Sequence, residues 1–170
     1  MKKLLILTLL LTACGSSPTP PSRDIPESAF QTIKVYFNND ANDCSSLAPL
    51  ERAVPKIKDI ETIALKNLFR GPSEDEKKAG HTSFFSAETS GILLSFHGAE
   101  GTAYVNLTDI RETIPNASSS CGSAMLLAEM DATIKQFGTY SNTLYAINGS
   151  SQDFYEWLQM ETPASFPDEF

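Results

Sequence analysis

The sequence is poor in the residues that most often carry chemistry: its 170 residues include three cysteines, two histidines and one tryptophan. It contains neither a Gly-x-Ser-x-Gly motif nor a glycine-rich phosphate-binding loop. The signatures of a serine hydrolase and of a nucleotide-binding enzyme are therefore missing. His81 and His97 have no zinc-ligand spacing with the cysteines, so we expect no metal and no cofactor. We also predict no catalytic residues, and hence no enzyme.

Positive charge is scarce as well. Lysine and arginine number 13 against 21 aspartates and glutamates, which gives a formal net charge of −8 with no basic cluster. A phosphate backbone would be repelled, so we exclude nucleic acid as a partner. After the first residues no apolar run is long enough to cross a bilayer as a helix. Any protein partner is expected to offer basic groups to this acidic chain.

The amino terminus has the form of a bacterial lipoprotein signal. Lys2 and Lys3 precede an apolar run over residues 4–11, and Leu-Thr-Ala leads directly to Cys14. This pattern predicts a signal peptide over residues 1–13 and lipid attachment at Cys14. Two or three acyl chains anchor a protein stably, so we expect the membrane as a partner and a location on the extracytoplasmic face of a bacterial membrane (cell membrane or outer membrane). The alternative is an ordinary signal peptide with an accidental cysteine.

Composition divides the remainder into three parts. Residues 14–29 are rich in proline and serine, which is typical of a linker that cannot bury enough apolar surface to order itself. Residues 30–160 have the size of one ordinary domain. Residues 161–170 are expected to form a flexible C-terminal tail.

Cys44 and Cys121 remain as an even pair in an exported chain, where disulfides persist. We predict a bond between them, which the chain-entropy treatment values at about 4–5 kcal/mol for so long a loop. The alternative is catalytic. Cys121 lies beside an expected helix N-terminus, which favours the thiolate, and His81 or His97 could act as base in a small Cys121-dependent hydrolase.

Hydrophobic periodicity predicts an α+β fold, with a small mixed β-sheet and helices packed on one face. Alternating apolar residues predict strands, and apolar stripes at helical spacing predict helices. The expected strands cover residues 31–38, 92–96, 103–107 and 143–147, with 47–55 extended at best and at an edge. The expected helices cover 60–69, 74–79, 122–137 and 153–158, and a hairpin turn is expected over 97–101. Asp59, Ser73, Ser119 or Ser120, and Ser150 or Ser151 are the expected N-caps.

Several tyrosines could line a groove, because aromatic faces stack on sugars and on partner chains. Tyr145 and Tyr155 are the candidates for such a ligand or partner surface. In a domain of this size most aromatic residues belong to the core, and this alternative stays open.

The central segment Ala-Leu-x-x-Leu-x-x-Gly-Pro-x-x-x-Glu-x-x-x-Gly-x-Thr-Ser, residues 64–83, resembles the opening helix and turn of the GerMN domain of sporulation and spore-germination lipoproteins. Residues 101–107, 126–137 and 145–149 are similar to later blocks of that domain. The resemblance covers residues 30–160 and a single copy. It implies a GerMN-like fold and a non-catalytic, lipid-anchored cell-envelope binding or assembly module. An envelope protein or a cell-wall glycan is then the expected partner, and a glycan or small-ligand sensor is the alternative.

Overall fold

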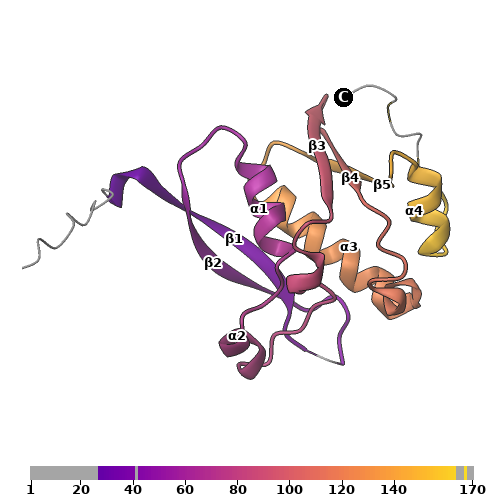
Figure 1. The fold of residues 1–170 in the computed structure, drawn as a ribbon, viewed down its shortest axis with the longest axis horizontal. Helices are drawn as coiled ribbons and strands as arrows, with labels where there is room; N and C mark the ends of the chain where they lie inside the picture. The colour runs from indigo at the N-terminus through magenta and orange to yellow at the C-terminus, as the bar shows by residue number, and fades with distance from the viewer. Residues whose placement is uncertain (1–26, 41, 164–166, 168–170) are drawn as a thin grey trace, which may run out of the picture.

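Two small β-sheets and four α-helices make up the part of the chain that the computed structural model describes, residues 27–40, 42–163 and 167. A two-stranded antiparallel sheet pairs β1 (Phe30–Asn38) with β2 (Leu47–Pro55). A three-stranded sheet has the order β3 (Leu93–Ala99), β4 (Thr102–Leu107), β5 (Asn142–Ile147), antiparallel and then parallel (Figure 1). The α+β class is confirmed, and its strands are divided between two sheets.

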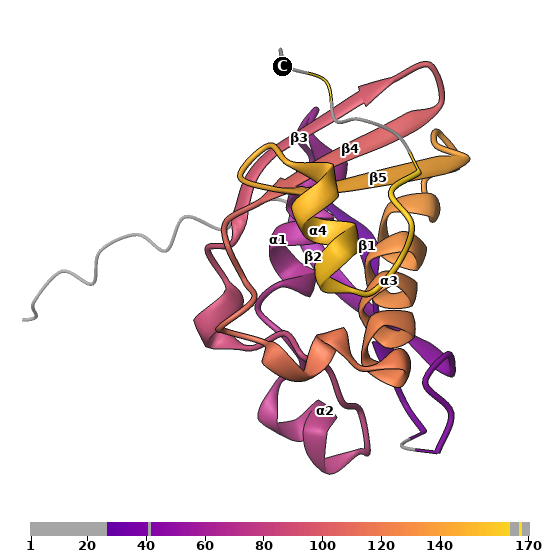
Figure 2. The ribbon, with the colours of Figure 1, turned by 90° about the vertical axis from the view of Figure 1, so that its right-hand side faces the viewer.

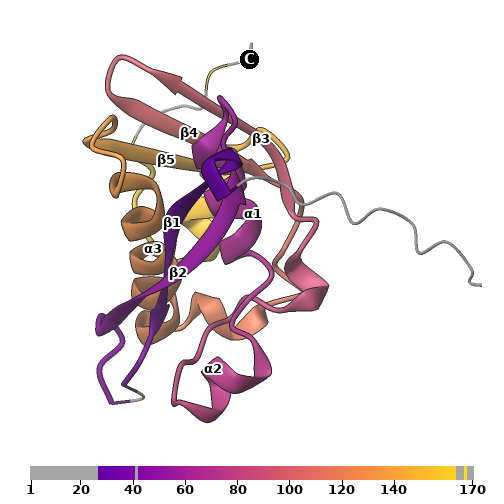
Figure 3. The same ribbon diagram turned by 90° about the vertical axis from the view of Figure 1, so that its left-hand side faces the viewer.

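The helices are α1 (Ile60–Leu68), α2 (Glu74–Lys78), α3 (Ser120–Lys135) and α4 (Ser151–Trp157). Short 3-10 turns occupy Glu27–Ala29, Ala87–Thr89 and Pro115–Ser118. In Figure 2, α1, α3 and α4 lie below the three-stranded sheet, as expected for helices on one face, and Figure 3 shows α1 and α3 there from the opposite side. The β1–β2 ribbon packs on α3 and α1. No helix among the described residues has the length and apolarity that a bilayer crossing requires.

The sequence patterns explain most of these elements. In β1 the alternating Ile33, Val35 and Phe37 are buried, and the intervening side chains are exposed or half-buried. Ser73 and Glu76 form the expected capping box at the start of α2. Asp59 occupies the expected N-cap position of α1, although its side chain makes no capping hydrogen bond.

Helix α3 begins earlier than the apolar stripe suggested. Ser119 is its N-cap, and the Ser119 hydroxyl accepts a hydrogen bond from the Gly122 N–H at 3.1 Å. A Cβ atom on Gly122 would overlap the Asn116 carbonyl. Glycine therefore lets the turn Pro115–Ser118 pack closely against the first turn of α3.

The β3–β4 hairpin is tighter than expected. Its turn consists of Glu100 and Gly101, both with positive φ, 50° and 75°. Two left-handed residues match the twist of the flanking strands, so the strands continue up to the turn. His97 and Gly98, expected in the loop, consequently belong to β3.

Apolar side chains from both sheets and from α1, α3 and α4 form the main core. A second, smaller cluster of Ile33, Val54 and Ala64 fills the space between the β1–β2 ribbon and α1. The expected signal peptide, Cys14 and most of the linker lie outside the described residues.

Candidate functional site

The predicted disulfide is present. Cys44, in the loop between β1 and β2, is bonded to Cys121 in the first turn of α3, with a Cα–Cα distance of 5.4 Å. This distance is typical of unstrained disulfides. The bond fixes the end of the β1–β2 ribbon to the start of α3. Because its sulfur is in this bond, Cys121 has no free thiol to serve as the nucleophile that the hydrolase alternative requires.

Side chains of α3 and of its C-cap residue Gln136 occupy the edge of β1 that β2 does not cover. They accept hydrogen bonds from the backbone N–H groups of alternate β1 residues. The pairs are Gln136 with Lys34 at 2.8 Å, Thr133 with Tyr36 at 3.2 Å and Glu129 with Asn38 at 3.1 Å. Acceptors four and three residues apart share one helix face, whereas donors two residues apart share one strand edge. We call this contact the α3–β1 seam.

Glu129 is the most unusual member of this seam. Its side chain is 0 % exposed, and its second carboxyl oxygen accepts a hydrogen bond from the Ser83 hydroxyl at 2.6 Å. Burial raises the pKa of Glu129 to about 8, although the hydrogen bonds from Ser83 and Asn38 oppose the shift. Burial thus favours the neutral form of this carboxyl group. It links β1, α3 and the segment that follows α2.

Asp131, two residues further along α3, lies on a different face of the helix. Its side chain is 31 % exposed and accepts hydrogen bonds from the hydroxyl groups of Thr143 and Tyr145 on β5. Lys135 donates to the other carboxyl oxygen at 2.7 Å. Three donors thus fix one carboxylate between α3 and β5.

A polar groove opens beside this carboxylate. It has a volume of about 450 Å³ and is lined by residues of β4, α3 and β5 and by the segment that leads into β5. We call it the β5-edge groove. Its lining residues are Thr102, Tyr104, Asp131, Lys135, Ser141, Asn142, Thr143, Leu144 and Pro163. Hydroxyl, amide and charged groups beside one aromatic side chain are suited to a polar, hydroxyl-rich ligand.

The expectation that Tyr145 and Tyr155 form an exposed surface was wrong. Their exposed fractions are 1 % and 5 %, and both rings pack on Phe154, with centroid distances of 5.3 and 5.2 Å. The strand β5 is buried from Leu144 to Ile147, so its alternation offers no exposed aromatic face. Tyr145 influences the β5-edge groove only through its hydrogen bond to Asp131.

Sequence reasoning missed both Glu129 and the β5-edge groove. Glu129 could have been found, because it lies three residues after Leu126 and four before Thr133, on the buried face of α3. The groove could not, because it joins residues from β4, α3 and β5 with no common sequence pattern. Nothing in the sequence reveals that Tyr104, not Tyr145, lines it.

The two histidines lie on different elements. His97 is half-buried in β3, and His81 follows α2, with its Nδ1 atom buried and without a hydrogen-bond partner among the described residues. Within residues 27–40, 42–163 and 167, no group of three or more histidine, cysteine, aspartate or glutamate side chains is placed to hold a metal ion.

Comparison with known proteins connects this structure to one family. A family model described as "Germane: Sporulation and spore germination" matches residues 34–153. The tandem GerMN domains of the sporulation protein GerM from Bacillus subtilis align with a TM-score of 0.57 and 19 % identity. The alignment covers 87 % of this chain but 49 % of that one, so this chain spans about half the length of the tandem structure.

A second solved structure, a candidate lipoprotein from Clostridium perfringens, aligns with a TM-score of 0.41 and 21 % identity over 71 % of this chain and 76 % of that one. A sequence comparison with curated proteins finds no match. The alignment with GerM supports the GerMN fold, and the family model covers well over half of the residues. The protein therefore belongs to the Germane family of sporulation and spore germination.

Proposed function

We propose that the protein is a non-catalytic binding or assembly module, tethered by a lipid on Cys14 to the extracytoplasmic face of a bacterial membrane. The observation that carries the binding role is the β5-edge groove, an open polar surface fixed between α3 and β5. Family membership and the lipoprotein-type N-terminus favour work in the cell envelope. The identity of the partner determines the biological process in which the module acts.

The state of Asp131 favours binding over catalysis. Protein donors fill three of the roughly four lone-pair sites that a carboxylate offers. A binding surface profits from groups that are already held in position, as these three donors hold Asp131. Cys121, the other candidate for chemistry, is engaged in the disulfide.

The tether has three parts in this proposal: a signal peptide over residues 1–13, the lipid-bearing Cys14, and a linker that ends at residue 29. A domain over residues 30–160 then works at the distance that the linker allows. The Cys44–Cys121 bond agrees with an oxidising compartment outside the cytoplasm.

Cell fractionation tests the tether. The Cys14→Ser variant should leave the membrane fraction or accumulate as unprocessed precursor, because no acyl chain can be attached. A Cys44→Ser/Cys121→Ser variant is the matched control and should remain with the membrane. Normal processing and detergent-phase partitioning of Cys14→Ser would refute the lipid anchor.

A glycan or small-ligand sensor is the second candidate function, and it is favoured by the hydroxyl, amide and aromatic groups of the β5-edge groove. Soluble cell-wall glycan fragments should bind the full-length chain in calorimetric titration. Asn142→Ala should weaken that binding, while Gln152→Ala, an exposed amide on α4, should not. Equal loss in both variants, or none in either, would exclude the β5-edge groove as the glycan site.

A further inference from the structure

Strand β3 leaves two backbone positions unpaired on its outer edge. Ala99 pairs with Thr102 across the two-residue turn, and the ladder alternates from there. In an antiparallel ladder every second residue bonds to the neighbouring strand. Phe96 and Gly98 consequently direct their N–H and C=O groups away from β4. Among the described residues, no side chain or backbone group forms a hydrogen bond with these four groups.

A groove runs along this edge. It has a volume of about 520 Å³ and lies between β3 and the start of α1. Phe96, Gly98 and Tyr140 line it together with Asp59 and Glu61. We call it the β3-edge groove. Because strands in a sheet lie about 4.8 Å apart, a strand that bonded to Phe96 and Gly98 would occupy this groove.

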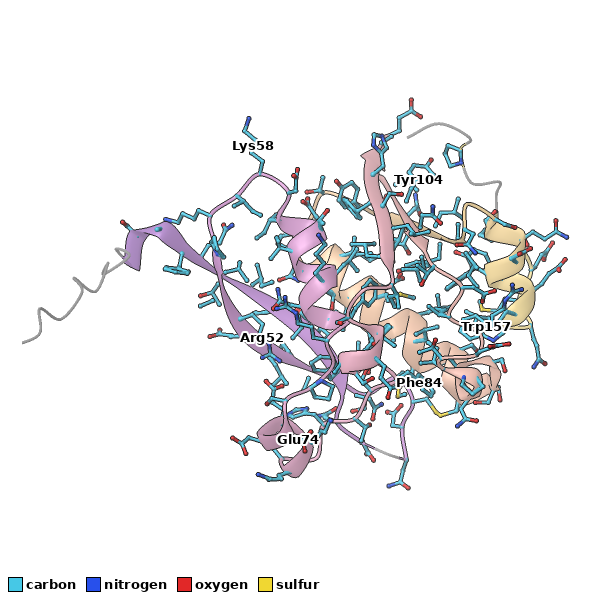
Figure 4. All side chains as sticks on the ribbon, viewed as in Figure 1. Arg52, Lys58, Glu74, Phe84, Tyr104 and Trp157 are labelled. Carbon is cyan, nitrogen blue, oxygen red and sulfur yellow. A yellow bond between two sulfur atoms is a disulfide. The ribbon has the colours of Figure 1, made fainter. Side chains whose placement is uncertain are left out.

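The charge over the β3-edge groove is negative. The carboxylate of Glu61 is close enough to Tyr140 to help burial raise the pKa of that phenol. Asp59 is exposed, and its side chain makes no capping bond to α1. Lys58 also borders the groove, but its side chain projects away from the body of the domain (Figure 4). Basic side chains in the groove would face two carboxylates.

The other described strand edges are each obstructed in part. The α3–β1 seam covers β1, and Pro49 and Pro55 occupy outward positions on β2, where they lack an N–H group. On β5 the Tyr155 hydroxyl is hydrogen-bonded to the Tyr145 backbone. Within the part of the chain that the structure describes, the outer edge of β3 combines unpaired backbone groups with an adjacent groove.

We propose that the β3-edge groove binds an extended, basic segment of a partner envelope protein by strand addition. The segment pairs its backbone with Phe96 and Gly98 and presents lysine or arginine to Asp59 and Glu61. Main-chain bonds supply affinity in such complexes, and side chains on alternate positions supply specificity. The proposal rests on the assembly role proposed above and identifies the chemistry of the partner.

A peptide titration tests this proposal. The full-length, ¹⁵N-labelled, disulfide-bonded chain is titrated with acetyl-Thr-Lys-Val-Lys-Val-Thr-amide. We expect the amide resonances of Phe96 and Gly98 to shift and their hydrogen exchange to slow. Full N-methylation of the peptide removes its donors and should weaken binding about tenfold or more. Replacing both lysines by glutamate should abolish it.

A charge variant locates the basic contact. Glu61→Gln should weaken peptide binding several-fold, while Glu88→Gln, an exposed glutamate on the 3-10 turn Ala87–Thr89, should leave it unchanged. Equal binding of the methylated peptide, or shifts confined to other elements, would overturn the proposal. So would concentration-dependent protection of Phe96 and Gly98 without peptide, since the occupant would then be a second copy of the chain. None of these outcomes affects the fractionation test of the Cys14 tether.

Discussion

The outer edges of β1 and β3 present the same kind of backbone surface and meet different neighbours. Along β1, three side chains of α3 accept hydrogen bonds from Lys34, Tyr36 and Asn38. Along β3, the adjacent helix α1 offers carboxylates across an open groove and no hydrogen bond to the strand among the described residues. A helix beside a strand therefore does not by itself protect an edge. Protection requires acceptors at the spacing of the outward N–H groups.

The β1–β2 ribbon is also joined to neighbouring elements by a disulfide and an ion pair. The disulfide fixes one end of the α3–β1 seam. Arg52 on β2, labelled in Figure 4, forms an ion pair with Glu76 at 2.6 Å and so holds the ribbon to α2. The β3 edge has no comparable closure among the described residues. From this contrast we propose that the β1–β2 ribbon and α3 maintain the fold, whereas the outer edge of β3 meets partners.

The largest effect is expected from breaking the covalent end of the seam. Cys44→Ala/Cys121→Ala should lower the free energy of unfolding by about 4–5 kcal/mol, because the unfolded chain regains the entropy that a long loop had lost. Urea denaturation of the variant and of oxidised wild type measures the difference. A change below about 1 kcal/mol would mean that the noncovalent α3–β1 seam alone fixes the ribbon.

The buried carboxyl group of Glu129 should make stability depend on pH. Its folded-state pKa of about 8 exceeds its ordinary value of 4.5. Its contribution to the free energy of unfolding is therefore complete below pH 4.5 and is lost as pH rises through 8, with a total on the order of 5 kcal/mol. Denaturation midpoints between pH 5 and pH 8 measure this slope. Glu129→Gln should flatten it and Glu88→Gln should not, whereas an unchanged slope in Glu129→Gln would refute the assignment.

The α3–β1 seam shows how far sequence reasoning reaches. Alternation and capping residues predicted β1, α2 and α3 closely, because those signals are local. The sequence also predicted the Cys44–Cys121 bond, because only two body cysteines were available. Three features could not be predicted in this way: the division into two sheets, the burial of Glu129, and the choice of which strand edge is covered. They depend on contacts between distant elements, such as those between α3 and β1. Contacts between residues about 100 positions apart leave no periodic signal in one sequence.

A smaller effect should follow from removing one acceptor of the seam. Thr133→Val keeps the shape but leaves the Tyr36 N–H without its partner, so we expect a loss of about 1–2 kcal/mol. Thr62→Val, on α1, is the matched control. Hydrogen exchange of the Tyr36 amide should accelerate in the first variant only. Equal stability of the two variants would show that water or a shifted neighbour replaces the Thr133 hydroxyl.

The smallest effect is expected on another face of α3. Lys135→Ala removes a partly exposed ion pair with Asp131, which should cost about 0.5 kcal/mol or less in thermal or urea unfolding. Asp131 keeps its hydrogen bonds from Thr143 and Tyr145, so the β5-edge groove should retain its shape. A loss above about 1.5 kcal/mol would show that the Lys135 contact supports the α3–β5 packing and not only the surface.

The central claim, one closed edge and one open edge, can be measured directly by amide hydrogen exchange of the full-length, oxidised chain. The amides of Lys34, Tyr36 and Asn38 should exchange slowly, because their N–H groups are bonded to α3. The amides of Phe96 and Gly98 should exchange rapidly until a basic strand peptide is added. Slow exchange at Phe96 and Gly98 in the free chain, or rapid exchange at the β1 amides, would contradict the account.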